Sequence, residues 1–363
     1  MADGTHDFIY FRRKFIYKEE MNVKPFTLVS TVFNENKRLL LTIDDLEAQQ
    51  VKPSQIIITD AGSSDGTFET LHAWAKRSVT EILILQKKKC NVAEGRNLAI
   101  RNAKFDLIVS TDFGCRFHPE WLKSIVTPFN DSSISIVGGA YSVEESKILS
   151  LPAKANYVLT NGYKVVLNTS FIPSSRSIAY YKSVWQSVGG YCEWLTLAAD
   201  DLIFGRAVLA QGYNIYLVPD PFVFWGRHES LEGYAKEANR YGLGDGEARV
   251  NMRNTASTIV ELIFRYLLFL TLFFFIANLL NPVMEPWYFF PVLIFLPGLR
   301  SYYRSFRNWW PLRSLKYDWK VLFYSFMLIE VTRYNYIKGF LKGFFFSSPG
   351  VKQNAKALAH ILR

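Results

Sequence analysis

The feature that most constrains the fold is an alternation of short apolar runs with amphipathic stretches. The runs are FTLVSTVF at 26–33, QIIIT at 55–59, EILIL at 81–85 and DLIVST at 106–111. Between them, apolar residues recur every three to four positions, as they do in helices that cover a sheet. Because parallel strands are joined by crossover helices, this alternation predicts a mostly parallel α/β sheet with helices on both faces.

Carboxylates stand at the ends of the predicted strands. Glu35 follows the first strand, Asp60 ends the second and Asp112 ends the fourth, and the pair Asp200-Asp201 opens a later amphipathic stretch. Ligands bind at the carboxyl ends of the strands in such sheets, so we expect these loops to converge. Carboxylates there can hold a divalent metal against a diphosphate or accept a proton from a hydroxyl. Each acid taken singly is equally well explained as a helix cap or turn residue.

Beyond about residue 257 the chain becomes strongly apolar. The stretch 259–280 is long enough to cross a hydrocarbon layer, which needs about 20 residues, provided that Arg265 pairs or snorkels. A turn-prone segment follows, and then a shorter apolar stretch with prolines, 287–299. The two stretches predict a membrane hairpin over about 258–299. The alternative is a buried helical subdomain in a soluble protein.

Basic residues flank this hairpin on both sides. Arg249 and Arg253 precede it, its connecting loop carries Glu285, and six bases follow: Arg300, Arg304, Arg307, Arg313, Lys316 and Lys320. By the positive-inside rule, both ends of the hairpin lie in the cytosol. A third apolar stretch, about 319–346, contains charged residues and precedes a basic tail, so we expect an interfacial helix. The predicted location is the cell membrane, with the N-terminal half facing the cytoplasm.

Charge indicates the kind of binding partner, and cysteine content indicates the cellular compartment. A net charge of +10 indicates an anionic partner, and the position of many bases next to the apolar region favours lipid over nucleic acid. The three cysteines, Cys90, Cys115 and Cys192, are widely spaced, which argues against a disulfide framework and for a reducing compartment. The first 25 residues contain no sustained apolar core, so we expect an N-terminal extension rather than a cleaved secretory signal.

Six motifs in register resemble those of the family-2 glycosyltransferases. They are TVFNE (31–35), IIITDAGSSDGT (56–67), EGRNLAI (94–100), STDFGC (110–115), SVGGYCEWLTLAADD (187–201) and EANRYGLGDG (237–246). The STDFGC loop is similar to that of a membrane-associated subgroup with Thr-Asp-x-Gly-Cys. The resemblance implies a GT-A fold, Rossmann-like in its sheet, and inverting sugar transfer from a nucleotide diphosphate. The expected divisions are an extension at 1–25, the glycosyltransferase domain at 26–250 and a membrane-associated region at 251–363.

The resemblance also implies donor-binding residues. Glu35 and Asp60 would lie against the base and ribose, together with Asn34 of the same Asn-Glu signature. Arg96 would either face the diphosphate or form a salt bridge within the protein. Asp112 would bind a divalent cation, Mg²⁺ or Mn²⁺, that neutralises the leaving diphosphate.

One position departs from the family pattern at the metal motif. Position 114 is glycine where the common Asp-x-Asp motif has its second acid. The metal would then be held by Asp112 with phosphate oxygens, water and a later side chain. His228 is the candidate for that later ligand, and the alternative is a structural histidine.

The implied catalytic pair is Asp200-Asp201. Asp201 would be the general base that deprotonates the acceptor hydroxyl, and Asp200 replaces the glutamate of the family's Glu-Asp pair. Repulsion between the two acids would raise the pKa of one of them. The alternative is a helix start at which acidic residues are stabilised by the helix dipole.

Three further residues are implied on the acceptor or diphosphate side. Arg240 and Tyr241 stand where the family has Arg-Trp, and Glu237 replaces its leading glutamine, which does not support a processive polysaccharide synthase. Arg176 would contact an anionic acceptor or form a structural salt bridge. The string GLGDG at 242–246 follows no predicted strand, so we expect a flexible lid or linker rather than a dinucleotide fingerprint.

The resulting prediction is a membrane-associated inverting glycosyltransferase that uses a UDP- or GDP-sugar. The predicted acceptor is lipid-linked and lies at the cytosolic membrane face. Two alternatives remain within the enzyme class, a polyprenyl-phosphate sugar synthase and a polysaccharide-chain glycosyltransferase. A third is a catalytically silent membrane scaffold that binds a nucleotide sugar.

Overall fold

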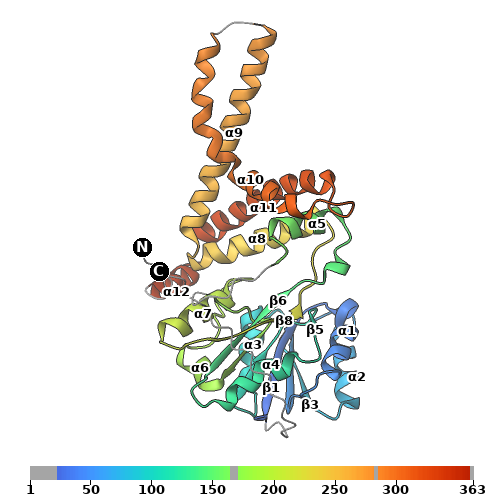
Figure 1. The fold of residues 1–363 in the computed structure, drawn as a ribbon. Coiled ribbons are helices and arrows are strands. Elements are labelled where there is room, and N and C mark those ends of the chain that lie inside the picture. Colours follow the sequence, from blue (N-terminus) through green and yellow to red (C-terminus); the bar gives the residue numbers. More distant parts are fainter. Residues whose placement is uncertain (1–22, 164–170, 282–284, 360–363) are drawn as a thin grey trace, which may run out of the picture.

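One mixed sheet forms the centre of the protein. The computed structural model describes residues 23–163, 171–281 and 285–359, so residues 1–22 of the predicted extension lie outside the description. The described strands pair in the order β3-β2-β1-β4-β7-β6-β8-β5 (Figure 1). Their bounds are β1 Phe26–Val32, β2 Gln55–Asp60, β3 Glu81–Gln86, β4 Leu107–Ser110, β5 Arg116–Phe117, β6 Ile136–Ser142, β7 Ile178–Tyr181 and β8 Tyr216–Phe224. Strands β1 to β4 are mutually parallel, and β7 runs antiparallel to both β4 and β6. The predicted α/β sheet is confirmed.

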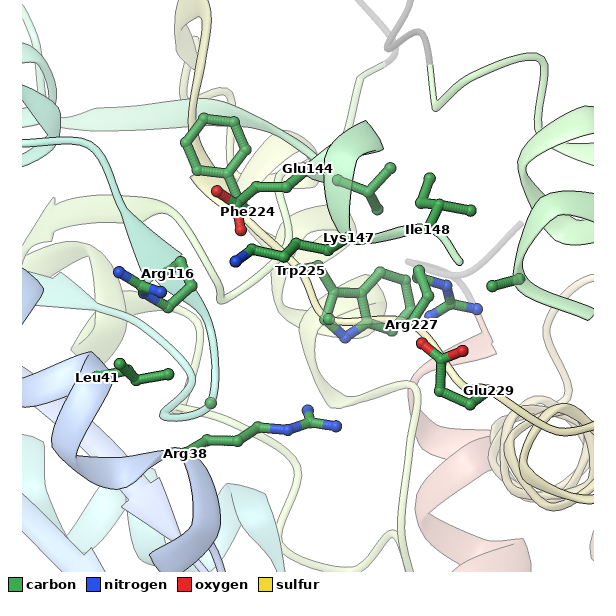
Figure 2. A pocket seen from close by; sticks show the side chains of 14 residues that line it. Arg38, Leu41, Arg116, Glu144, Lys147, Ile148, Phe224, Trp225, Arg227 and Glu229 are labelled. Carbon is green, nitrogen blue, oxygen red and sulfur yellow. The ribbon is translucent and has the colours of Figure 1, made fainter. Parts of the chain in front are cut away.

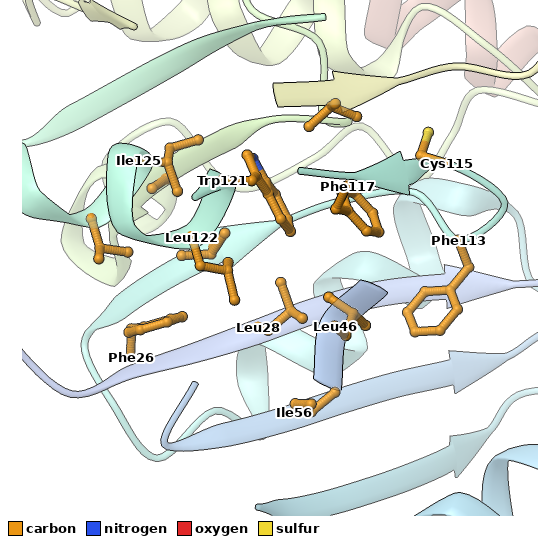
Figure 3. Close-up of a cluster of buried hydrophobic side chains, with 14 of the residues drawn as sticks. Phe26, Leu28, Leu46, Ile56, Phe113, Cys115, Phe117, Trp121, Leu122 and Ile125 are labelled. Carbon is orange, nitrogen blue, oxygen red and sulfur yellow. The ribbon is translucent and has the colours of Figure 1, made fainter. Parts of the chain in front are cut away.

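Both faces of the sheet are buried because alternate residues of each strand point to opposite sides. On β1, Leu28 belongs to one apolar cluster and its neighbour Val29 to another, and both are fully buried. Figure 3 shows the first cluster, in which Trp121 and Phe117 lie above Leu28. A strand buried on both faces needs a continuous apolar run, and the sequence of β1 supplies one.

Helices from both sides supply these clusters. The first cluster takes residues from α1 (Asn36–Glu47), α2 (Thr67–Arg77) and α4 (Trp121–Val126). The second takes residues from α3 (Val92–Arg101), α6 (Lys182–Ser187) and α7 (Asp200–Ala210). Short 3₁₀ helices η1 (Thr127–Asn130) and η2 (Glu145–Lys147) follow α4 and β6. The helices on both faces match the sequence prediction.

A second layer of helices lies beyond the sheet (Figure 1). It consists of α5 (Leu151–Leu159), α8 (Leu231–Ala248), α10 (Arg300–Trp309), η4 (Trp310–Leu312), α11 (Trp319–Phe346) and α12 (Pro349–Ala357). Helices α8 and α11 cross at glycines: a Cβ added at Gly242 would lie 2.0 Å from the carbonyl oxygen of Tyr336, and one at Gly339 would lie 2.2 Å from that of Asn239. Residues 242–246 therefore lie within α8. The prediction of a flexible lid or linker there is wrong, because these glycines allow two helix backbones to approach closely.

The hairpin projects from this layer (Figure 1). It consists of α9 (Met252–Leu280) and η3 (Pro286–Leu299), which contains the second predicted apolar stretch. Within the part of the chain that the structure describes, α9 is the one helix long and apolar enough to cross a membrane. Of the two options expected for Arg265, pairing and snorkelling, the structure has pairing: the buried side chain contacts Glu261 at 2.8 Å and also Glu330 of α11. The pair with Glu330 joins α9 to the second layer, whereas the pair with Glu261 lies within α9.

Candidate active site

The loops after β1 and β2 are tied together by hydrogen bonds. The Asn34 N–H donates to Ser63 Oγ at 2.9 Å, and the Ser64 N–H donates to Asn34 Oδ1 at 2.9 Å. The Glu35 N–H donates to Thr67 Oγ1, also at 2.9 Å. Asn34 adopts a left-handed conformation, with φ 54°, which Asn tolerates better than most residues. The polar side chains of both motifs thus fix the shape of this loop pair.

Asp60 holds the second of these loops from inside. Its side chain is fully buried, and Oδ2 accepts hydrogen bonds from the N–H groups of Gly62 and Ser63 and from Gln86 Nε2. Gly62 has φ +94°, a conformation that favours glycine at this turn. Asp60 does not line the cavity described next. Its predicted contact with the base or ribose stays a prediction.

The expected convergence of loops forms a cavity of about 800 Å³, called here the first cavity. Its lining includes residues that follow β1, β2, β3 and β4, and its charged members are Glu35, Arg38, Lys88, Lys89, Asp112, Arg176 and Arg240. Five of these seven side chains are basic. A cavity with this excess of positive charge at the carboxyl ends of parallel strands suits an anionic ligand such as a diphosphate.

The Glu35 carboxylate lies next to Gly114 in the first cavity, which Asp112 also lines. A Cβ added at Gly114 would lie 2.9 Å from Glu35 Oε2, so the Glu35 carboxylate occupies space next to the position of the missing second acid. Burial raises the pKa of Glu35, with the Arg38 charge acting in the opposite direction and Asp65 and Asp112 adding to the rise. The charge of Asp112 therefore acts on Glu35 within the first cavity.

A buried arginine connects Asp112 with the catalytic pair implied by the sequence. Arg96 is 2% exposed, and its Nη1 lies 2.6 Å from Asp200 Oδ2 while Nη2 lies 3.1 Å from Asp112 Oδ1. Its guanidinium also lies 4.7 Å from the centre of the Tyr191 ring. Of the two predicted roles, the structure has the internal salt bridge. Burial raises the pKa of Asp200 to about 6 against the opposing charge of Arg96.

Asp201 points to a different space from Asp200. It lines a second cavity, of about 670 Å³, together with residues of α8, α9 and α11. Ser174 Oγ lies 3.3 Å from Asp201 Oδ2, and Arg176 Nη1 donates to the same Ser174 Oγ at 2.9 Å. Since Arg176 lines the first cavity, the chain Arg176–Ser174–Asp201 joins the two cavities. Ala199, which precedes the acid pair, has φ 74°, a costly conformation for a residue with a Cβ.

The predicted Arg240 and Tyr241 are divided between the two cavities in the same way. Arg240 lines the first cavity and Tyr241 the second. The Tyr241 hydroxyl lies 3.4 Å from Glu237 Oε1. Helix α8 therefore contributes one cationic side chain to the first cavity and one aromatic side chain to the second.

Trp225 is a site residue that the sequence reasoning missed. It lines the first cavity and a third one of about 260 Å³, where Figure 2 shows it next to Arg227. The guanidinium groups of Arg176 and Arg227 lie 4.0 and 3.9 Å from its ring centre. Arg227 in turn forms a two-pronged ion pair with Glu237, at 3.1 and 2.8 Å. The aromatic run FVFW before the basic Gly-Arg-His was the available signal.

His228 lies apart from Asp112. Its Nε2 is 3.7 Å from Glu237 Oε2, its ring packs edge-on against Tyr234, and burial lowers its pKa. It does not line the first cavity. Within the described residues, no group of three or more His, Cys, Asp or Glu side chains could hold a metal. Asp112 and Glu35 remain as hard oxygen donors that face the first cavity, a set that suits Mg²⁺ or Mn²⁺ when substrate phosphates supply further ligands.

Comparisons with known families agree with this arrangement. The model of Glycosyl transferase family 2 matches residues 27–183, and that of Glycosyl transferase family group 2 matches residues 116–302. The chain belongs to the family-2 glycosyltransferases. The enzyme class expected from the motifs is thereby confirmed.

The relatives of this glycosyltransferase are distant. It is 26% identical over 228 residues to the O-antigen chain rhamnosyltransferase WbaN of Salmonella anatum. The matched segment covers 60% of this chain and 70% of the relative. It is 23% identical over 146 residues to the hyaluronan synthase of Pasteurella multocida, which covers 38% of this chain and 15% of that synthase. The mannosyltransferase PcManGT from Pyrobaculum calidifontis, solved with GDP-Man and Mn²⁺, superposes with a TM-score of 0.51 at 16% identity, over 91% of this chain and 92% of that one. This last likeness shows the GT-A fold.

Proposed function

We propose that this glycosyltransferase is membrane-attached and moves a sugar with inversion from a UDP- or GDP-sugar to a lipid-linked acceptor at the cytosolic membrane face. One observation carries the proposal. The cation-rich first cavity and the second cavity, which contains Asp201, are joined by the Arg176–Ser174–Asp201 chain. The donor diphosphate is assigned to the first cavity and the acceptor to the second.

The residues of the first cavity act on the donor. Arg176 and Arg240, with Lys88 and Lys89, place positive charge around the diphosphate and stabilise the charge that develops as it leaves. Asp112 and Glu35 are the residues that would hold Mg²⁺ or Mn²⁺, which when bound neutralises the diphosphate oxygens. His228 remains a proposed ligand only if it moves out of its contact with Glu237.

Asp201 acts on the acceptor. A carboxylate opposite the leaving nucleotide accepts the proton of the attacking hydroxyl, so the new bond forms on the face opposite the broken one. Asp200 is a positioning residue in this scheme, because its ion pair with Arg96 also holds Asp112. Its backbone is continuous with Asp201, so the same ion pair fixes the start of α7.

The proposal of a lipid-linked acceptor is supported by the position of the second cavity next to the start of α9. Its lining includes Asn254, Thr255 and Thr258 at the start of α9, the helix that is long enough to cross a membrane. Exposed bases Arg300, Arg304 and Arg307 lie on α10 at the base of the hairpin and suit an anionic lipid surface. The division of the chain at 250/251 into a catalytic domain and a membrane region is proposed on the same grounds.

Two relatives favour a glycan over a lipid phosphate as the acceptor. One is an O-antigen chain rhamnosyltransferase and the other a hyaluronan synthase. A polysaccharide-chain glycosyltransferase is therefore the second candidate function.

A panel of nucleotide sugars tests the proposal. The purified protein is heated with each UDP- and GDP-hexose, with and without Mn²⁺, because a ligand that binds the folded state raises the melting temperature. We expect one donor to stabilise the protein, more so with Mn²⁺, and to be consumed when a lipid extract is added. If no nucleotide sugar stabilises the protein or is consumed, the proposal fails.

A further inference from the structure

The chemistry of the second cavity indicates which part of the acceptor reaches Asp201. Its titratable lining residues are Asp201, Glu237, Asp245 and Arg333, with tyrosines besides. Arg333 lies 2.8 Å from Glu261, and Glu237 is neutralised by its ion pair with Arg227. Asp201 and Asp245 therefore give the cavity an excess of negative charge.

A lipid phosphate is a poor ligand for such a cavity. Its phosphate carries at least one negative charge at neutral pH and would lie beside two carboxylates, so Coulomb repulsion would weaken binding. Nor does a phosphate oxygen need a general base, because it is already ionised, whereas a sugar hydroxyl does. Arg176 and Arg240 line the first cavity and not this one, and Arg333, the one basic residue in the lining of the second cavity, is paired with Glu261.

The rest of the lining suits a sugar. Amides and hydroxyls predominate among the remaining polar residues: Asn156, Asn251, Asn254, Thr255, Thr258, Thr332, Tyr234, Tyr241 and Tyr336. Asp245 is held in place by Tyr336 Oη at 2.5 Å and Asn251 Nδ2 at 2.9 Å, which fixes a hydrogen-bond acceptor on one wall. Carboxylates and amides placed in this way bind neutral hydroxyl groups.

We infer that the acceptor group bound in the second cavity is a neutral sugar residue of a lipid-linked saccharide, and not the terminal phosphate of a lipid phosphate. This inference rests on the proposed function. In the reaction, the acceptor oxygen bonds to C1 of the donor sugar while the bond from C1 to the diphosphate oxygen breaks. The hydroxyl proton passes to Asp201, and the nucleoside diphosphate leaves with the electron pair of the broken bond. Asp245 is assigned as a residue that determines this acceptor specificity.

The direct test uses the full-length protein with a native lipid extract and the donor identified by the panel above. Mass spectrometry of the product shows whether the new sugar is attached to a saccharide or to a lipid phosphate. We expect attachment to a saccharide, with no competition from added undecaprenyl phosphate. A sugar monophosphate lipid, or competitive inhibition by undecaprenyl phosphate, overturns the inference. Donor hydrolysis without any lipid product also overturns the inference, but it leaves the donor site of the proposed function standing. If the donor is not cleaved at all, the proposed function itself is refuted.

Variants of the cavity wall give a second measurement. Asp245→Asn replaces a charged hydrogen-bond acceptor by a neutral amide, and Thr258→Val removes a hydroxyl from the wall. For each variant we expect the KM for the saccharide acceptor to rise about tenfold, the effect of one lost hydrogen bond to a charged or hydroxyl group. Two control measurements show whether a variant is misfolded: the rate of donor hydrolysis without acceptor, and the melting temperature. Asp220→Asn, on β8 away from both cavities, is the matched control. An unchanged acceptor KM in both wall variants contradicts the assignment.

Discussion

The guanidinium of Arg96 lies 2.6 Å from the carboxylate of Asp200, and the two side chains are 3% and 13% exposed. The same guanidinium reaches Asp112 at 3.1 Å. A residue on α3 thus ties the loop after β4 to the first turn of α7, although these segments lie far apart along the chain. The site residues on either side of Arg96 keep their spacing because of this contact.

Replacing Arg96 should destabilise the protein. Arg96→Met removes the cation and leaves Asp200 buried without its partner, which typically costs about 3–5 kcal/mol. We expect a clearly lower free energy of unfolding in denaturant titrations. The double variant Arg96→Met with Asp200→Asn should recover part of the loss, because the uncompensated charge is gone. A single variant as stable as the parent would contradict the role given to this ion pair.

The raised pKa of Asp200 should appear in the pH dependence of stability. Its pKa is about 6 in the folded protein against an ordinary value of 3.8, so the folded state binds more protons between these values. This contribution to stability is complete below about pH 4 and is lost as the pH rises to about 6. Melting temperatures measured across this range should show a fall that Asp200→Asn removes. If the melting temperature depends on pH in the same way in the parent and in Asp200→Asn, the raised pKa of Asp200 is contradicted.

The glycine contacts between α8 and α11 should tolerate no side chain. In Gly339→Ala the new Cβ would lie 2.2 Å from the carbonyl oxygen of Asn239, so the helices must separate, at a cost of about 1–3 kcal/mol. Gly350→Ala is the control, because nothing lies within 4 Å of a Cβ there. We expect a lower melting temperature in the first variant only.

The bases of α10 should control binding to anionic lipid. Arg304→Glu and Arg307→Glu are expected to weaken sedimentation with vesicles that contain phosphatidylglycerol, by about 1 kcal/mol or more each. Sedimentation with neutral phosphatidylcholine vesicles should change little. Equal losses with both kinds of vesicle would mean that charge does not guide the attachment.

Sequence periodicity was sufficient to predict the sheet and the convergence of its loops. Every strand of the parallel half carries an apolar run, and the carboxyl ends of parallel strands meet at one edge of the sheet, so Glu35 and Asp112 could be placed at that edge. The convergence of these loops is seen in the structure. Two options were open for Arg265 within an apolar helix, pairing and snorkelling, and the structure has the ion pair.

The direction in which each side chain points could not be predicted from the sequence. Asp60 turns inward to hold its own loop, and the neighbours Asp200 and Asp201 face different spaces, because a helix sends successive residues about 100° apart around its axis. The run GLGDG was misread because glycines that break isolated helices also permit close helix contacts, and only the partner helix α11 decides between the two. Trp225 is a site residue because its ring contacts Arg176 and Arg227, and the spacing of these residues along the chain does not predict such contacts.

The most direct test of the central claim is the turnover of Asp201→Asn, measured beside its affinity for the donor nucleotide sugar. If Asp201 is the base that receives the acceptor proton from the second cavity, kcat should fall by about 10²- to 10⁴-fold, while donor affinity and melting temperature remain close to those of the parent and of the Asp220→Asn control. Turnover at the parental rate in Asp201→Asn would contradict the account.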